Sequence, residues 1–161
     1  MLKDVPHAEL TEKIIGAAIE VHKTLGPGLK EEVYEASLEV ELGLRGMKCK
    51  RQVPVNVVYK GVNIDDNDHP KRIDMVVEGA VGIECKALPT SYDPIFKAQC
   101  LTYLKMLGLK TGLVINFGLT TIKEGVKRVV NETREEYLAR LSKENPVGLK
   151  MLKAEEDGER L

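Results

Sequence analysis

Apolar residues recur every three or four positions over the first 44 residues, with one interruption. This spacing predicts an amphipathic helix over 10–25, with Thr11 as its N-terminal cap, and a second helix over 29–44. Gly26-Pro27-Gly28 separates the two, because glycine and proline disfavour helix interiors. The second helix is expected to bury a stripe that consists of Val33, Ser37, Val40 and Leu44.

After the second predicted helix, the spacing of apolar residues changes from one typical of helices to one typical of extended strands. The runs 53–59 and 62–64 flank Lys60-Gly61, which predicts a β-hairpin. A polar loop is expected over 65–70. Another apolar run, 73–77, follows this loop and predicts a strand.

The second half of the chain begins with a predicted helix over 94–107, capped by Asp93-Pro94. Strands are predicted over 112–117 and 126–130, although 122–130 also fits a helix. We therefore expect an α/β sandwich of the αβββαββ type, in which helices flank a mixed central sheet. This domain spans residues 1–131, and residues 132–161 form a charged helix over 132–143 and a poorly ordered tail.

The composition is that of a globular protein, with 161 residues, 43% hydrophobic and 30% charged. No apolar stretch approaches the roughly 18 residues of a membrane span, and the N-terminus lacks the apolar core of a secretory signal. We expect a cytoplasmic protein that contacts no membrane. Its cysteines, Cys49, Cys85 and Cys100, lack metal-binding spacing and are interpreted as buried free thiols. The histidines, His22 among them, are interpreted as surface residues.

Three charged residues interrupt the apolar strands. Glu84 and Lys86 are two apart in an apolar run, so their side chains point to one face of a strand, and Cys85 points to the other. A turn centred on Gly79 places Asp74 opposite Glu84, with Cβ atoms roughly 5 Å apart. Two such carboxylates repel unless a cation lies between them. The pattern favours a divalent-metal site beside a lysine, and the alternative is a surface ion pair.

Two helical pairs extend this set. Gln99 and Tyr103 are four apart, and Glu31 and Tyr34 are three apart, so each pair projects from one helix face. Both pairs are candidates to line the same cleft. The alternatives are a solvated Gln99, a core Tyr103, and a Glu31 that is exposed together with Glu32 and Glu35.

A net charge of −1 gives no overall attraction for a polyanion, so any nucleic-acid substrate is expected to be held by local clusters of basic residues. Lys71 and Arg72 are close to the predicted site, and Arg51 belongs to a cluster with Lys48 and Lys50. The alternative is that these are solvated charges on an edge strand. Tyr34 and Tyr103 are candidates for stacking on bases.

A known family shares these landmarks. The stretch 28–34, Gly-Leu-Lys-Glu-Glu-Val-Tyr, resembles the pattern that names the GxxExxY family. Further landmarks follow in the order of that family through Asn131: Gly26-Pro27-Gly28, Arg51-Gln52-Val53-Pro54, Tyr59-Lys60-Gly61, the Asp74 strand, Glu84-Cys85-Lys86, Gln99 to Tyr103, and Ile115-Asn116-Phe117. This family is similar to the PD-(D/E)XK nuclease superfamily, and Ile73 stands where the superfamily's name has proline.

The resemblance implies a restriction-endonuclease-like core and a metal-dependent phosphodiesterase site. It implies Asp74, Glu84, the Cys85 carbonyl and Glu31 as ligands of Mg²⁺ or Mn²⁺, and Lys86 as the catalytic lysine. Gln99 and Tyr103 resemble the Gln-xxx-Tyr element of the exonuclease-like branch. The partner would be DNA or RNA.

Two functions remain open from the residues. The first is a nuclease, and the second is a binding or assembly module of the same fold that does not turn over or needs a partner to do so. The number of metals, the choice between DNA and RNA, exonuclease or endonuclease action, and whether the protein forms a homodimer also remain open.

Overall fold

A computed structural model describes residues 5–64, 68–90, 94–156 and 158 of the chain. The chain divides into two compact units, one of residues 5–131 and one that contains residues 132–161. Residues 65–67 of the predicted polar loop over 65–70, and the predicted helix cap Asp93, lie outside the described residues.

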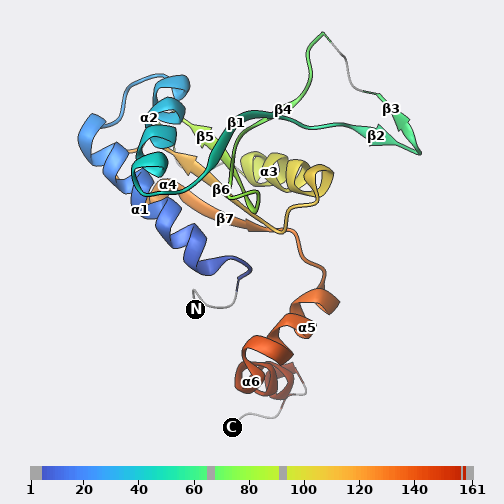
Figure 1. The fold of residues 1–161 in the computed structure, drawn as a ribbon. Helices are drawn as coiled ribbons and strands as arrows, with labels where there is room; N and C mark the ends of the chain where they lie inside the picture. The colour runs from blue at the N-terminus through green and yellow to red at the C-terminus, as the bar shows by residue number, and fades with distance from the viewer. Residues whose placement is uncertain (1–4, 65–67, 91–93, 157, 159–161) are drawn as a thin grey trace. The chain divides into compact units, whose positions relative to one another are not determined.

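The larger unit contains both helices and strands (Figure 1). In chain order they are α1 (Ala8–Leu25), α2 (Glu31–Leu44), β1 (Cys49–Pro54), β2 (Val58–Tyr59), β3 (Val62–Asn63), β4 (Arg72–Val77), β5 (Val81–Lys86), α3 (Pro94–Leu107), β6 (Thr111–Asn116), α4 (Ile122–Gly125) and β7 (Val126–Val130). The strands predicted over 112–117 and 126–130 are confirmed, and the helical alternative holds only for the short α4.

Five strands form a mixed sheet in the order β1-β4-β5-β6-β7. Neighbours are antiparallel except β5 and β6, which are parallel and are joined through α3. Helices α1 and α2 pack on one side of this sheet and α3 on the other (Figure 1). The predicted α/β architecture with a mixed central sheet between helices is therefore confirmed.

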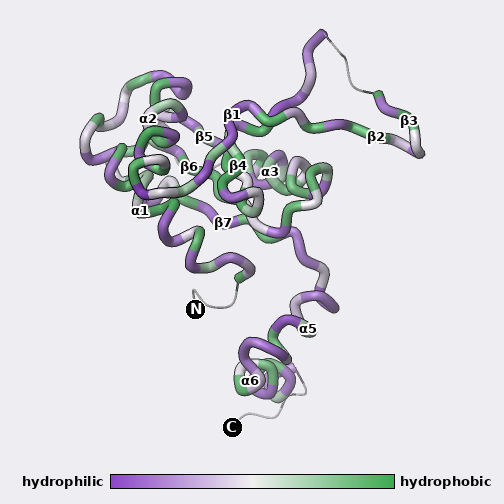
Figure 2. Tube along the Cα trace, viewed as in Figure 1, coloured by the Kyte–Doolittle hydropathy of each residue, from purple (hydrophilic) through white to green (hydrophobic). Residues whose placement is uncertain are grey.

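The predicted hairpin is confirmed, but its first strand is shorter than expected. Lys60 and Gly61 form the turn with φ of 49° and 81°, the left-handed geometry of a two-residue hairpin. The run 53–59 is divided between β1, which pairs with β4, and β2, which pairs only with β3. Hydrophobic residues line β2 outside the five-stranded sheet (Figure 2), and Tyr59 is 61% exposed.

Helix α2 buries a different face from the predicted one. Tyr34, Leu38 and Leu42 are fully buried at spacings of four, and Glu35 is buried beside them. The predicted stripe faces outward instead, since Val40 is 62% exposed and so does not pack in the core. Apolar residues occur on both sides of this helix, so periodicity alone selected the wrong face.

Two predictions on α1 are wrong. The helix begins at Ala8, so Thr11 lies within the first turn, where its hydroxyl donates to the Ala8 carbonyl at 2.8 Å. His22 is buried rather than exposed, and its Nε2 lies 2.7 Å from the Leu119 carbonyl. This hydrogen bond satisfies the ring nitrogen in a buried position.

The second unit contains α5 (Arg134–Glu144) and α6 (Pro146–Glu156). The predicted helix over 132–143 is confirmed as α5, which begins with a capping box between Thr133 and Glu136. Residues 146–156, which belong to the tail expected to be poorly ordered, form the helix α6. In the described part of the chain, no helix is both long and apolar enough to cross a lipid bilayer.

Candidate metal and phosphodiester site

The register between β4 and β5 agrees with the predicted one. The last pair of the ladder is Met75 opposite Ile83, so the next positions along the strands are Asp74 and Glu84. Gly79 turns the chain between the strands with φ of 64°. The two carboxylates therefore start from neighbouring backbone positions, as the turn centred on Gly79 predicts.

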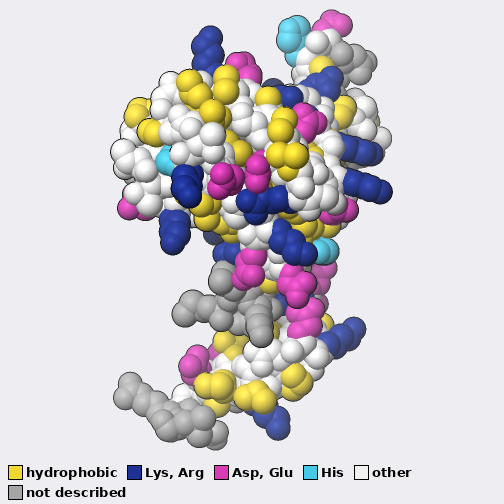
Figure 3. All heavy atoms as spheres, turned by 60° about the vertical axis from the view of Figure 1, so that its left-hand side comes forward, with side chains coloured by type: hydrophobic (Ala, Val, Ile, Leu, Met, Phe, Trp, Pro, Cys, Tyr) yellow, Lys and Arg dark blue, Asp and Glu magenta, His cyan; other side chains and the backbone are white. Residues whose placement is uncertain are grey.

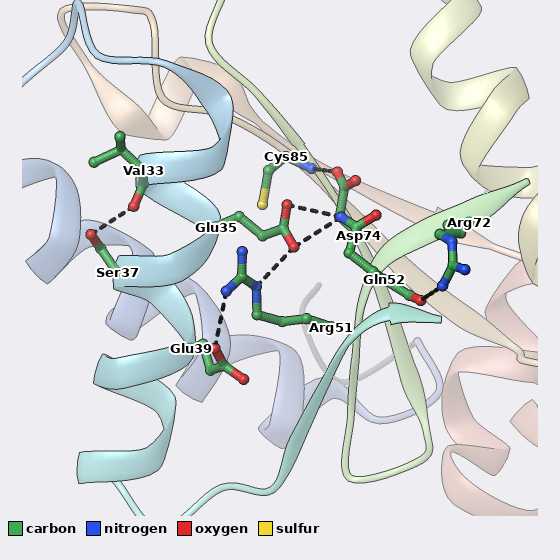
Figure 4. A network of polar contacts seen from close by, with 9 residues as sticks. All are labelled: Val33, Glu35, Ser37, Glu39, Arg51, Gln52, Arg72, Asp74 and Cys85. Carbon is green, nitrogen blue, oxygen red and sulfur yellow. Dashed lines mark hydrogen bonds and ion pairs between the residues drawn. The ribbon is translucent and has the colours of Figure 1, made fainter. Parts of the chain in front are cut away.

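The ladder between the two strands ends where the site begins. The Cys85 N–H donates to Oδ2 of the Asp74 side chain at 2.7 Å instead of to a carbonyl of β4 (Figure 4). Within a strand, the N–H and C=O of one residue point to the same side. The Cys85 carbonyl therefore points toward β4, on the side of Asp74, and its side chain lies in the core on the α1 and α2 side.

Glu84 is a buried acid with an uncompensated oxygen. It is 3% exposed, and its Oε1 has no hydrogen-bond partner among the described residues. Its Oε2 lies 3.8 Å from Lys86 Nζ. The pKa of Glu84 is raised from 4.5 to about 8, chiefly by burial and also by the negative charge of Asp74, whereas the positive charge of Lys86 opposes both effects.

Two other carboxyl groups belong to the same electrostatic cluster. Burial raises the pKa of Asp74, while the hydrogen bond from Cys85 lowers it. Burial also raises the pKa of Glu31, which the charge of Lys86 lowers and that of Asp74 raises. Glu31 lies at the start of α2, so this helix delivers a third acid to the strand pair.

Lys86 connects the strand pair to α3. Its Nζ donates to Gln99 Oε1 at 3.3 Å and lies 5.1 Å from the centre of the Phe96 ring. Gln99 in turn donates to the Tyr103 hydroxyl at 3.3 Å. The helical pair predicted to line the cleft therefore reaches the lysine, with Tyr103 at the far end of the chain of hydrogen bonds.

A metal ion would find a partial ligand set here. Among the described residues, no three His, Cys, Asp or Glu side chains lie close enough together to hold one ion. The expected set included three such side chains, those of Glu31, Asp74 and Glu84, which therefore do not converge on one point in this structure. Asp74 and Glu84, together with the Cys85 carbonyl and water molecules, would form a smaller set of oxygen ligands. The unpartnered Oε1 of Glu84 would suit a cation as a ligand, because a buried carboxylate oxygen without a partner is costly.

Some predicted substrate contacts are engaged within the protein. Tyr34 is fully buried, with its ring stacked 4.8 Å from Phe117 and its hydroxyl bound to the Gly26 carbonyl, so stacking on bases does not fit it. Arg51 pairs with Glu35 at 2.9 Å and also contacts Glu39.

The remaining basic candidates lie near the surface. Lys71 and Arg72 are exposed, and Arg72 donates to the Gln52 carbonyl at 2.8 Å. Lys48 and Lys50 line an open cavity of about 560 Å³ rather than the site itself. Lys and Arg interleave with Asp and Glu on the face shown in Figure 3, so the basic groups do not form a field of one sign there.

Two residues of the site were not predicted. Glu35, expected to be an exposed acid, is only 4% exposed and accepts from Gln52 Nε2, and Gln52 also hydrogen-bonds Asp74. The available signal was spacing, since Glu35 is four residues after Glu31 and so lies on the same helix face.

Comparison with known proteins identifies the family. A family model described as the PD-(D/E)XK nuclease superfamily matches residues 8–129, a range that begins with α1 and ends one residue before the end of β7. Neither the curated proteins nor the solved structures gave a match. Since the matched range covers well over half of the sequence and includes the Asp74, Glu84 and Lys86 cluster, this chain belongs to the PD-(D/E)XK nuclease superfamily.

Proposed function

We propose that the protein hydrolyses phosphodiester bonds of nucleic acid with the help of Mg²⁺ or Mn²⁺. The observation that carries this proposal is Glu84, whose buried carboxyl group has an unpartnered Oε1 beside Asp74 and Lys86. A fold that buries such a group without a compensating partner loses stability, which is typical of sites kept for function. The membership of the nuclease superfamily supports the same conclusion.

The ion would be held by Asp74, Glu84 and the Cys85 carbonyl, with Glu31 reaching in from α2. Oxygen ligands and bound water suit Mg²⁺ and Mn²⁺. Such an ion neutralises charge on a phosphate and lowers the pKa of water. Asp74 keeps one oxygen on the Cys85 N–H, which fixes the direction of the carboxylate.

Lys86 is proposed as the catalytic lysine. Its Nζ is held between Glu84 Oε2 and Gln99 Oε1, so the ammonium stays next to the carboxylates instead of extending into solvent. From there it can orient an attacking water or stabilise negative charge as it develops on phosphate. Tyr103 and Gln99 position this ammonium from α3.

Substrate would be held mainly through its phosphates. Lys71 and Arg72 are the exposed cations that begin the Asp74 strand, and Arg51 is proposed only as a weaker contact because Glu35 and Glu39 already neutralise it. Few phosphate contacts predict weak binding that falls with salt and depends little on sequence.

The test is an incubation of the purified protein with single- and double-stranded DNA and RNA, with Mg²⁺, Mn²⁺ or a chelator. We expect cleavage that requires metal and is lost in Asp74→Ala and Lys86→Ala. Lys97→Ala is the matched control, since Lys97 is exposed on the same helix as Gln99. Absence of metal-dependent cleavage, or cleavage that survives Asp74→Ala, would contradict the proposal.

A binding module on the same fold is the second candidate. It is favoured by the internal engagement of Arg51 and Arg72, which leaves fewer cations for a polyanion. Calorimetry that detects binding of metal or nucleic acid without hydrolysis would select this function. The absence of any binding would eliminate it.

A further inference from the structure

Gln52 adopts a backbone conformation that is rare for its residue type. It lies inside β1 with φ of 50°, in the left-handed region. The direction of the backbone groups reverses there. In a regular strand, the backbone groups that face a given neighbour recur at every second residue. Before Gln52, the even-numbered Lys48 faces β4, where its carbonyl accepts from the Glu78 N–H. After Gln52, the odd-numbered Val55 faces β4, where its N–H donates to the Lys71 carbonyl.

In the facing strand β4, the alternation of side chains between the two sides of the sheet also reverses at the matching position. Met75 and Val77 pack in the core on the α1 and α2 side. Ile73 would share that side in a regular strand, yet it packs with Val76 in the cluster that includes residues of α3. The reversal therefore falls at Asp74, the residue opposite Gln52 in the register of these strands.

The side chain of Gln52 connects this reversal to the site (Figure 4). Its Nε2 donates to both oxygens of Glu35, at 3.0 and 3.1 Å, and the side chain also hydrogen-bonds Asp74. Glu35 is itself fixed by Arg51 Nε at 2.9 Å. Arg72 donates to the Gln52 carbonyl at 2.8 Å, which holds the unusual backbone in place.

We propose that Gln52 and Glu35 are positioning residues, which hold the Asp74 carboxylate in the opening between β4 and β5 so that one oxygen binds the Cys85 N–H and the other is available to a cation. This inference rests on the proposed function, because it assumes that the Asp74 carboxylate binds a cation. Left-handed residues other than glycine persist where the surroundings impose them, and such strain is concentrated at functional sites. The amide of Gln52 donates to both oxygens of Glu35 and also hydrogen-bonds Asp74, so this one side chain links the two neighbouring acids.

The test compares Gln52→Gly with Lys60→Gly. Both positions have a left-handed backbone, with φ of 50° and 49°, so glycine relieves strain equally, but only the first change removes an amide from the site. Readouts are the urea midpoint, the hydrogen-exchange rates of the Cys85 and Val114 amides by NMR, and the affinity for Mn²⁺ by calorimetry.

In Gln52→Gly we expect an unchanged or higher urea midpoint, Cys85 exchange faster by about tenfold or more relative to Val114, and Mn²⁺ binding weaker by about 10- to 100-fold. Lys60→Gly should change neither the Cys85 exchange nor Mn²⁺ binding. Unchanged Cys85 exchange in Gln52→Gly, or equal acceleration of both amides with a lower midpoint, would overturn the proposal. If the wild-type protein binds no Mn²⁺, the metal proposal fails, whereas the exchange comparison still decides the role of Gln52.

Discussion

The Cys85 N–H donates to the Asp74 carboxylate at 2.7 Å, in place of the strand carbonyl that an uninterrupted ladder would offer. One side-chain oxygen thus completes the hydrogen bonding of the sheet where β4 and β5 part. The opening leaves a carboxylate and a main-chain carbonyl at the same point of the sheet. The break in the ladder and the proposed metal ligands therefore involve the same two residues, Asp74 and Cys85.

Asp74→Asn is expected to fold and to lose metal binding. An amide oxygen can still accept from Cys85, so the backbone donor remains satisfied, but the negative charge that attracts a cation is gone. Asp74→Ala leaves that donor without its acceptor and is expected to destabilise the protein by about 1–3 kcal/mol. Urea denaturation and calorimetry with Mn²⁺ separate the two effects. Equal stability losses in both variants would contradict the assigned role of the carboxylate oxygen.

The metal-free protein should lose stability as the pH rises from about 4.5 to about 8. The pKa of Glu84 is raised from 4.5 to about 8 on folding, so the native state holds more protons than the unfolded state across this range. The free energy of unfolding therefore falls with increasing pH. The raised pKa values of Asp74 and Glu31 act in the same direction. Urea titrations at pH 5 and pH 8 with a chelator measure the difference.

The control for this pH effect is Glu84→Gln, which keeps the shape of the side chain without its titration. Its stability should vary less between pH 5 and 8 than that of the wild-type protein, and it should be the more stable of the two at pH 8. Saturating Mg²⁺ should flatten the wild-type profile, because a cation favours the charged carboxylate. A wild-type protein that becomes more stable with rising pH would refute the assignment.

Tyr34→Phe should cost stability without changing substrate binding. The hydroxyl donates to the Gly26 carbonyl and accepts from the Leu29 N–H, which holds the turn between α1 and α2. Loss of these bonds is expected to cost about 0.5–1.5 kcal/mol for each. Because the ring is fully buried against Phe117, KM for nucleic acid should stay unchanged. A large rise in KM at constant stability would restore the predicted role in base stacking.

The sequence predicts the sheet and the acid pair because both follow from local rules. Alternation identifies the strands, and symmetry about Gly79 sets Asp74 opposite Glu84 without any tertiary information. The helical spacing of Gln99 and Tyr103 likewise places both side chains on one face, which reaches Lys86. Each of these predictions depends only on the residue spacing within one helix or strand, or within two strands joined by a short turn.

The parts that could not be predicted depend on contacts between distant segments. Glu35 appears as one of several acids on α2, and its burial results from Arg51 and Gln52 of β1, more than 15 residues away. The reversal of the backbone direction at Gln52 cannot be predicted from the alternation of apolar and polar residues, since glutamine has no special preference for a left-handed backbone. The buried face of α2 was missed because Tyr34 joins the core by stacking on Phe117, which follows β6.

Gly112→Ala should destabilise the protein and disturb the site through α3. Gly112 pairs with Gly82 under that helix, and an added Cβ would lie 2.8 Å from Cys100 Sγ and 3.0 Å from Leu104 Cδ1. Overpacking of this kind costs about 1–3 kcal/mol. Since Cys100 follows Gln99 on α3, a shift of the helix should weaken the bond between Gln99 and Lys86 and lower kcat more than it raises KM.

Two further variants check this explanation. Cys100→Ala combined with Gly112→Ala removes the closest contact and should recover part of both the stability and kcat. Gly43→Ala is the matched control, because Gly43 lies in α2 with nothing within 4 Å of an added Cβ, and alanine there should raise stability by roughly 0.5–1 kcal/mol. Urea denaturation and cleavage kinetics on the same preparations provide both readouts. Full activity in Gly112→Ala despite the lost stability would show that α3 does not position Gln99 against the lysine.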